Sequence, residues 1–353
     1  MLPLSICLIA KNEQNCIQKC LTSLAPFLNT GAELVITDTG STDRTKEIAA
    51  QYTNQIYDFT WCDDFSAARN YCASKAHNQL ILTLDCDETL LCDDDSAETI
   101  LQDILSHNPD TAGIIKRNSP TISGTVTVDP IARLYDKNIY HYHGIIHEQL
   151  FRIDDATPSY SHTHIRFEHS GYNNPILTQE KSLRNLQLLK QAESVNPNDV
   201  YTLFQIAQCH RMLSDYESAL VYYQKALSLD VNPSLNYVKT LVESYGYTLL
   251  DLKRPNEVLS LYGVYDSFCD RADFVFLMGL ANMQCGLTQE AIDEFKKAVT
   301  IPNYCVEGTN SYLAFYNLGV IYECMGNTQL AIEYYQKCKN YKLAEKRLLI
   351  LMS

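Results

Sequence analysis

The 353-residue sequence lacks several patterns that define common protein classes. It has no run of about 18 apolar residues, so no transmembrane segment is expected. Its 13 cysteines include no C-x-x-C pair, which argues against a zinc site or a disulfide framework. Reduced thiols predict a cytoplasmic protein. The apolar stretch 2–10 has no basic segment before it and meets Lys11 early, unlike a secretory signal.

Basic residues are also scarce, since 28 Lys and Arg face 42 Asp and Glu for a net charge of −14. Residues 1–172 carry most of the excess, with 23 acidic and 12 basic residues. This charge argues against nucleic acid or an anionic membrane as the main partner. It suits a site that recruits a divalent cation and binds an anionic ligand through it.

The first 90 residues alternate between short apolar runs and helical spacing, which predicts a parallel, doubly wound α/β sheet. The expected strands are 4–9, 33–37, 56–59 and 80–84, and the expected helices are 14–28, about 43–52 and 65–76. After residue 109 the pattern changes to antiparallel strands, at 112–117, 121–129 and 131–135, followed by a histidine-rich stretch with no obvious helix.

From about residue 176 the sequence is helical and repetitive. Small residues, alanines and aromatics recur at positions 8, 20, 24 and 27 of a 34-residue frame, which is the pattern of tetratricopeptide (TPR) repeats. The matching sets begin at Ala207, Gly279 and Gly319, with a weaker copy at Gly246. We therefore predict two domains, 1–175 (α/β) and 176–353 (all-α, TPR-like), with a plain helical bundle as the alternative for the second.

Three polar blocks follow predicted strands or begin a predicted helix. Asp38, in the block 38–43, ends a strand, where ligands of open α/β sheets bind, and it could accept a uracil imide N–H. A simple capping turn is the alternative. Arg69, in the block 61–70, suits a base carbonyl or a diphosphate, although a surface arginine would look the same.

The third block, 85–88, follows a buried strand. Asp85 and Asp87 are two residues apart in an extended segment, so they should project together, with no basic residue nearby in the sequence. Two like charges held so close favour a cation between them, and Mn²⁺ or Mg²⁺ fits oxygen ligands and phosphates. A solvated acidic turn is the alternative.

Taken in order, these blocks resemble the family 2 glycosyltransferases of the GT-A (Rossmann-like) fold. The matching segments are 9–13, 38–43, 64–70, 84–88, 143–148 and 167–172. With TPR units following, the chain resembles the subgroup of sublancin-type peptide S-glycosyltransferases and flagellin-modifying transferases. The resemblance implies a UDP-sugar donor, with UDP-glucose or UDP-N-acetylglucosamine favoured, and inverting transfer. It also implies a protein or peptide acceptor, such as flagellin or a bacteriocin-like peptide.

The same resemblance assigns site residues. The cation would be held by Asp87 and His169, with Asp85 at the metal or its bound water. The expected nucleotide-sugar contacts are Ala10, Asn12, Glu13, Asp38, Arg69, Asp85 and Cys86.

An inverting transfer needs a general base, for which we predict Glu148, with His147 as the competitor. Either could instead be an ordinary polar residue at a strand end. The sequence lacks the Gln-x-x-Arg-Trp motif of processive family members, which favours the addition of a single sugar.

Two other functions compete with glycosyl transfer. The block 85–89 also fits a haloacid-dehalogenase-like phosphatase, with Asp85 as nucleophile and Asp87 as acid/base, but no Gly-Asp dipeptide supplies that fold's later acidic pair. A non-catalytic TPR scaffold is the other. The TPR surface would contact the acceptor or a second copy of the chain in a homodimer.

Overall fold

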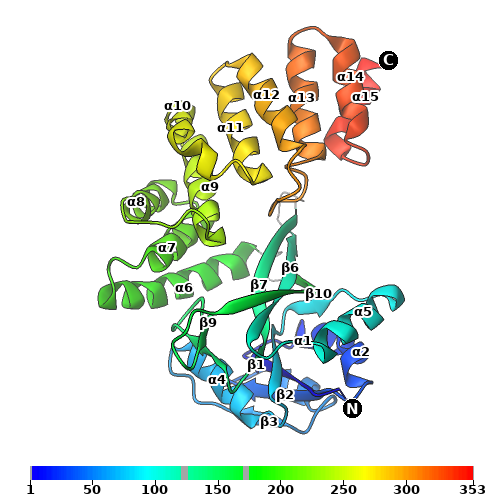
Figure 1. Ribbon diagram of the computed structural model, residues 1–353, viewed down its shortest axis with the longest axis vertical. Helices are drawn as coiled ribbons and strands as arrows, with labels where there is room; N and C mark the ends of the chain where they lie inside the picture. Colours follow the sequence, from blue (N-terminus) through cyan, green and yellow to red (C-terminus); the bar gives the residue numbers. More distant parts are fainter. Residues whose placement is uncertain (1, 121–125, 170–174, 353) are drawn as a thin grey trace. The chain divides into compact units, whose positions relative to one another are not determined.

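The computed structural model describes residues 2–120, 126–169 and 175–352 (Figure 1). It divides into two compact units, Met1–Thr178 and Gln179–Ser353. Each unit has its own apolar core. The predicted order, an α/β unit followed by a helical repeat unit, is confirmed.

The first unit is built on an eight-stranded sheet of order β3-β2-β1-β4-β7-β6-β10-β5. The four strands at the β3 end are parallel, β7 is antiparallel to β4 and β6, and β10 is parallel to β6. A separate pair, β8 and β9, is antiparallel. The strands are β1 Leu4–Ala10, β2 Glu33–Asp38, β3 Ile56–Asp58, β4 Leu80–Asp85, β5 Glu88–Leu90, β6 Thr111–Pro120, β7 Val126–Asp136, β8 Tyr140–His143, β9 Gln149–Arg152 and β10 Ser159–His169.

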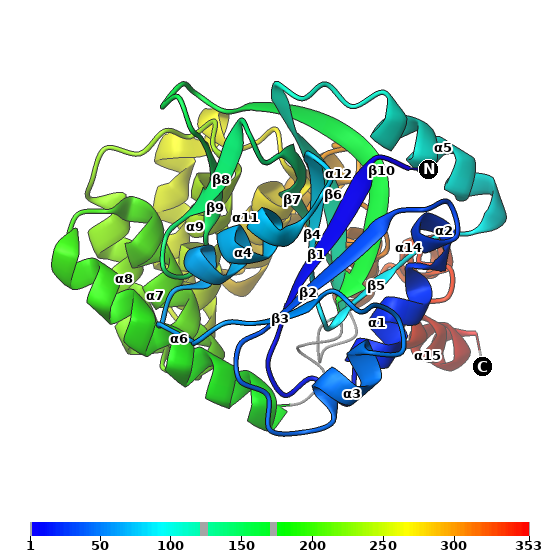
Figure 2. The same ribbon diagram turned by 90° about the horizontal axis from the view of Figure 1, so that it is seen from below.

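Helices cover both faces of this sheet, as Figure 2 shows for α4 on one side and α1, α2 and α5 on the other. Alternate side chains of β1 therefore enter two cores: Ile6 and Leu8 pack into one, and Cys7 packs into the other together with Cys72 of α4. The helices are α1 Ile17–Ser23, α2 Ala25–Leu28, α3 Thr45–Ala49, α4 Phe65–Lys75 and α5 Asp94–Leu105.

Two of the differences between the first unit and its prediction involve a proline. The helix expected at 14–28 is split into α1 and α2, because Pro26 begins a new turn at the second helix. The strand break expected at Pro130 does not occur, since β7 continues through it and Pro130 pairs in register with Lys116. The segment 121–125 lies outside the described residues.

The second unit consists of helices that follow one another in chain order (Figure 1). The pairs α7/α8, α11/α12 and α13/α14 pack closely, as TPR units do. Small residues allow this packing, because a Cβ on Gly279 would meet Phe295 at 2.7 Å. The elements are α6 Pro175–Val195, α7 Val200–Met212, α8 Tyr216–Leu227, α9 Asn236–Asp251, α10 Pro255–Val258, the 3₁₀ helix η1 Leu259–Ser267, α11 Ala272–Gln284, α12 Thr288–Ala298, α13 Tyr312–Cys324, α14 Thr328–Lys337 and α15 Lys342–Leu351.

The weak repeat that begins at Gly246 has an irregular second half, because the short α10 and η1 replace a full helix there. Within the described parts of the chain, no helix is both long and apolar enough to cross a membrane.

Candidate active site

The start of α4 places Arg69 beneath the carboxyl edge of the parallel strands. Asp64 caps this helix by accepting a hydrogen bond from the backbone N–H of Ala67 at 2.9 Å. The backbone N–H of Phe65 donates to the carbonyl of Ile145 at 2.9 Å, which ties the helix to the segment before β9. Arg69 is only 5% exposed as a result.

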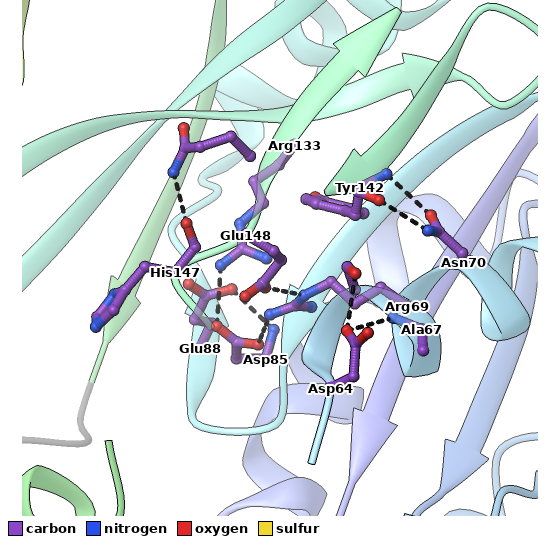
Figure 3. A network of polar contacts seen from close by, with 12 residues as sticks. Asp64, Ala67, Arg69, Asn70, Asp85, Glu88, Arg133, Tyr142, His147 and Glu148 are labelled. Carbon is purple, nitrogen blue, oxygen red and sulfur yellow. Dashed lines mark hydrogen bonds and ion pairs between the residues drawn. The ribbon is translucent and has the colours of Figure 1, made fainter. Parts of the chain in front are cut away.

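Arg69 joins two carboxylates that are far apart in the sequence (Figure 3). Its Nη2 donates to Asp85 Oδ1 at 2.7 Å, and its Nε donates to Glu148 Oε1 at 2.5 Å. On the other side of Asp85, Arg133 Nη2 donates to Oδ2 at 3.0 Å. Charged hydrogen bonds of this kind fix side chains strongly. The four side chains therefore form one network at the end of β4.

This network corrects the expectation that Asp85 has no basic partner. Burial alone would raise the pKa of Asp85, but the charges of Arg69 and Arg133 outweigh it and hold that pKa well below its usual range. With both oxygens bound to guanidinium groups, Asp85 is a poor metal ligand and a poor nucleophile for a phosphatase. Arg133 was missed because it lies 48 residues beyond Asp85 in the sequence.

Glu88 belongs to the same network, because it binds the backbone of Asp85. Its Oε2 accepts a hydrogen bond from the backbone N–H of Asp85 at 3.0 Å. Burial, and then the nearby charge of Asp85, raise the pKa of Glu88. In the sequence, the position of Glu88 in the acidic block 85–88 is the only signal that it contacts Asp85.

Asp87 and His169 come together as predicted, although they are 82 positions apart in the sequence. Antiparallel pairing of β5 with β10 sets His169 opposite Glu88, and His169 Nε2 lies 3.3 Å from Asp87 Oδ2. Within the ranges described, no cluster of three or more His, Cys, Asp or Glu side chains is arranged to hold a metal. At a cation held by the predicted pair, Asp87 and His169, ligand oxygens would have to complete the coordination.

Asp38 ends β2 and is buried. Its Oδ2 accepts from the backbone N–H groups of Gly40 and Ser41 at 3.1 and 3.0 Å. Its Oδ1 is buried and meets no hydrogen-bond partner among the residues that the structure describes. A buried carboxylate oxygen left in this state fits a donor group on a ligand.

The other predicted nucleotide-sugar residues hold the surrounding backbone. Asn12 Oδ1 accepts from the N–H of Thr42 at 2.8 Å, which joins the loops after β1 and β2. The Ala10 carbonyl accepts from the N–H of Thr39 at 2.9 Å. Glu13 contacts Cys16 through its carboxylate at 2.9 Å.

The side chain of Cys86 lies in the core, where it donates to the Ile9 carbonyl at 3.4 Å. Cys86 was predicted to contact the nucleotide sugar, but its side chain is buried among the apolar side chains of the sheet. Only the backbone of Cys86 remains available for a ligand.

Of the two candidate bases, Glu148 is the one inside the network. Its carboxylate binds Arg69, which itself binds Asp85. His147 has a positive φ of 51°, and Figure 3 shows its imidazole pointing away from the other labelled side chains. The geometry therefore favours Glu148.

Comparisons with known proteins assign a family to each unit. Residues 5–162 match the family described as glycosyl transferase family 2, and residues 200–233 and 312–344 match tetratricopeptide repeats. The N-terminal unit thus belongs to the family 2 glycosyltransferases, and the helical unit carries TPR repeats.

Two curated relatives share this sequence over part of their length. The SPbeta prophage-derived glycosyltransferase SunS of Bacillus subtilis (strain 168) is 26% identical over 276 residues, covering 72% of this chain and 60% of that protein. A TPR repeat-containing protein of Synechococcus elongatus is 30% identical over 210 residues, covering 57% of this chain and 50% of that protein. The chain thus spans 50 to 60% of the length of these relatives.

Solved structures also resemble part of the chain. One is YrrB, described as a TPR protein with an unusual peptide-binding site, at 20% identity and a TM-score of 0.40, with 50% of this chain and 88% of that chain covered. Another is MamA, at 19% identity and a TM-score of 0.40, with 48% and 92% covered.

Proposed function

We propose that the chain is an inverting glycosyltransferase that moves a single sugar from a UDP-sugar to a protein or peptide acceptor. The observation that carries the proposal is the position of Glu148. This carboxylate is held by Arg69 next to Asp85, at the edge of the sheet where ligands of α/β folds bind.

Glu148 would act as the general base. It takes the proton of the acceptor hydroxyl or thiol while that atom attacks the anomeric carbon of the sugar. The bond from the anomeric carbon to the diphosphate oxygen breaks on the opposite face, and UDP departs with the electron pair. Arg69 would hold the base in place throughout, because it binds Glu148 and Asp85 together.

Asp87 and His169 would hold the divalent cation that family 2 enzymes typically use. Bound there, Mn²⁺ or Mg²⁺ would neutralise the charge of the departing diphosphate. A carboxylate and an imidazole 3.3 Å apart suit Mn²⁺ somewhat better than Mg²⁺, because Mg²⁺ prefers oxygen ligands alone.

Asp38 would bind the uracil base. Its buried Oδ1 could accept the imide N–H, and the turn N–H groups hold the other oxygen in place. A cytosine ring has no N–H at that position, so this arrangement favours uridine over cytidine nucleotides.

The TPR unit would bind the acceptor, since TPR surfaces usually bind extended peptides or another subunit. The relative SunS, a glycosyltransferase, aligns with this chain across both units, so a glycosyltransferase domain followed by this helical unit is not peculiar to this chain. UDP-glucose and UDP-N-acetylglucosamine are the donors that we favour.

The test is UDP release by the purified chain from a panel of UDP-sugars, first with Mn²⁺ and then with EDTA. We expect slow hydrolysis of one donor that stops when the metal is removed. The Glu148→Gln variant should still bind UDP, which separates loss of chemistry from loss of folding. If no donor is hydrolysed and UDP with Mn²⁺ gives no thermal stabilisation, the proposed function is wrong.

A further inference from the structure

Buried polar atoms without partners are concentrated around Asp85. Five of them are Arg69 Nη1, Glu88 Oε1, Arg133 Nε, Arg133 Nη1 and Tyr142 Oη, none of which meets a hydrogen-bond partner in residues 2–120, 126–169 or 175–352. Folded proteins satisfy the great majority of such atoms. A group of them in one place indicates that a polar ligand or ordered water completes the site.

Arg133 contributes the most unused hydrogen-bonding capacity. A guanidinium group carries five N–H donors. Arg133 directs one of them from Nη2 to Asp85, while its Nε and Nη1 meet no partner among the described residues although the side chain is buried, at 6% exposure. Arg69 differs, because its Nε and Nη2 both bind carboxylates. Two nitrogens of Arg69 thus hold other side chains and only Nη1 has no partner in the described residues, whereas two nitrogens of Arg133 are left for a ligand.

The order of the strands indicates which part of a donor would meet Arg133. Asp38, Asp85 and Arg133 lie on β2, β4 and β7, in the sheet order β2-β1-β4-β7. Neighbouring strands are about 4.8 Å apart, so β7 lies roughly 14 Å from β2 across the sheet. If the uracil binds at Asp38, the sugar at the other end of the nucleotide reaches the side of β7. Glu148 lies on that side as well, through its bond to Arg69.

The charges in the network favour an uncharged sugar. Two guanidinium groups, of Arg69 and Arg133, face two carboxylates, of Asp85 and Glu148. Arg117 also acts on Asp85, but it pairs with Asp129 at 3.4 Å. Glu88 adds a carboxyl group rather than a cation. The network therefore leaves no positive charge over for a carboxylate on the donor sugar. Hydroxyl oxygens, which accept hydrogen bonds without adding charge, match the unpaired N–H groups better.

We propose that Arg133 recognises the donor sugar by donating hydrogen bonds from Nε and Nη1 to the hydroxyl oxygens of an uncharged hexose. This inference rests on the proposed function, because it takes a UDP-sugar as the ligand. It adds a sugar-contacting residue that lies outside the acidic block and the predicted base.

The experiment compares UDP with UDP-sugar in the same protein. Dissociation constants for UDP, UDP-glucose, UDP-N-acetylglucosamine and UDP-glucuronate would be measured by calorimetry with Mn²⁺. The proteins are the wild type, Arg133→Gln, Arg133→Lys and Arg152→Gln. Arg152 is a matched control, since this arginine pairs with Asp154 at the end of β9. Within one protein, the ratio of the dissociation constant for UDP-sugar to that for UDP is compared, so that an inactive fraction of the sample affects both constants equally.

Arg133→Gln should weaken binding of the UDP-sugar that the wild type prefers by about tenfold to a hundredfold, and change UDP binding little. Arg133→Lys should recover part of the loss, and Arg152→Gln should resemble the wild type. If Arg133→Gln does not fold, Arg133→Lys carries the same comparison with a smaller loss.

Equal weakening of UDP and UDP-sugar would overturn the proposal, because Arg133 would then act only through Asp85. No weakening of either would overturn it too, as would tighter wild-type binding of UDP-glucuronate than of UDP-glucose. A wild type that binds no UDP-sugar at all would instead refute the proposed function.

Discussion

At the scale of single residues, the site depends on pairs that the sequence separates. Arg69 binds Glu148 across 79 positions and Asp85 across 16. In the sequence alone, Arg69 resembles an ordinary helix residue, Glu148 an acid at the end of a strand, and Asp85 part of an acidic turn. Only the packing of α4 against the sheet turns them into one network that could hold a base beside a donor.

Glu148→Gln should lower kcat for sugar transfer by about 100- to 10,000-fold, because the acceptor proton then has no base to take it. Affinity for UDP should stay close to that of the wild type, since the glutamine oxygen can still accept from Arg69. His147→Gln is the control, and steady-state rates with UDP binding would be measured for both. A larger loss of kcat in His147→Gln than in Glu148→Gln would assign the base to the histidine.

Asp87→Asn should remove the Mn²⁺-dependent thermal stabilisation of the chain by UDP, because one of the two metal-binding side chains is lost. The melting temperature without ligand should change little. Asp110→Asn, an exposed aspartate in a loop, is the control. Unchanged stabilisation in Asp87→Asn, measured by thermal melts with Mn²⁺ and with EDTA, would contradict a cation at this position.

At the scale of helices and strands, the sequence predicted the regular parts of the fold. The strands β1 to β4 follow apolar runs bounded by polar residues, and α4 follows from its capping Asp64 and its small residues. The elements β5 and α5 were not predicted. β5 has three residues, which is too few for a periodic pattern, and α5 begins in the acidic run after Asp93, which resembles a solvated turn.

Half of the candidate site could be predicted in the same way. Asp38, Arg69 and Asp87 lie at ends or starts of elements with clear patterns. The partners of Asp85 could not be predicted from the sequence, because strand register and helix packing decide which distant side chains meet. Arg133 lies inside a strand, between Ala132 and Leu134, so nothing next to it in the sequence marks it as part of a network.

The TPR pairs allow a prediction at this scale. A Cβ added to Gly319 would lie 2.6 Å from the ring of Tyr335, which is held by a hydrogen bond to Glu323 at 2.8 Å. Gly319→Ala should therefore lower the free energy of unfolding by about 1–3 kcal/mol. Gly263→Ala is the control, because a Cβ there meets nothing within 4 Å. Urea unfolding followed by circular dichroism measures both, and equal stabilities would contradict the packing.

At the scale of the whole molecule, the two units should divide the work. A chain that ends at residue 199 should still bind UDP with Mn²⁺ and hydrolyse the donor slowly, because the site lies in the first unit. It should fail to modify a protein acceptor that the full chain modifies. Normal acceptor modification by the folded shorter chain, measured by mass spectrometry, would remove the TPR unit from acceptor binding.

The second unit should lose stability as the pH rises toward 8. Burial raises the pKa of Glu243 to about 8, because it outweighs the attraction of Arg271, which lies 3.3 Å away and is shared with Asp273. An unfolded glutamate titrates near about pH 4.3. Between these two values the folded state holds the extra proton, so the free energy of unfolding falls with rising pH, by up to about 1.4 kcal/mol per unit.

Glu243→Gln should remove this part of the pH dependence. Lys239 and Asp270 also act on Glu243, but they form an ion pair with each other, and the variant leaves that pair in place. Unfolding of the helices between about pH 5 and pH 8 would be followed by circular dichroism. The single tryptophan, Trp61, reports separately on the first unit by fluorescence. A pH dependence that is the same in both proteins would contradict the assignment.

The placement of the network across the sheet also bears on how such enzymes could diversify. Asp38 stands on the early parallel strands, whereas Arg133 and Glu148 come from the segment 111–169. If the roles proposed for these residues hold, inherited changes in that later segment could alter the specificity for the donor sugar and the acceptor. Binding of the nucleotide would stay the same. Chimaeras that exchange this segment between related chains would be a direct route to new donor choice.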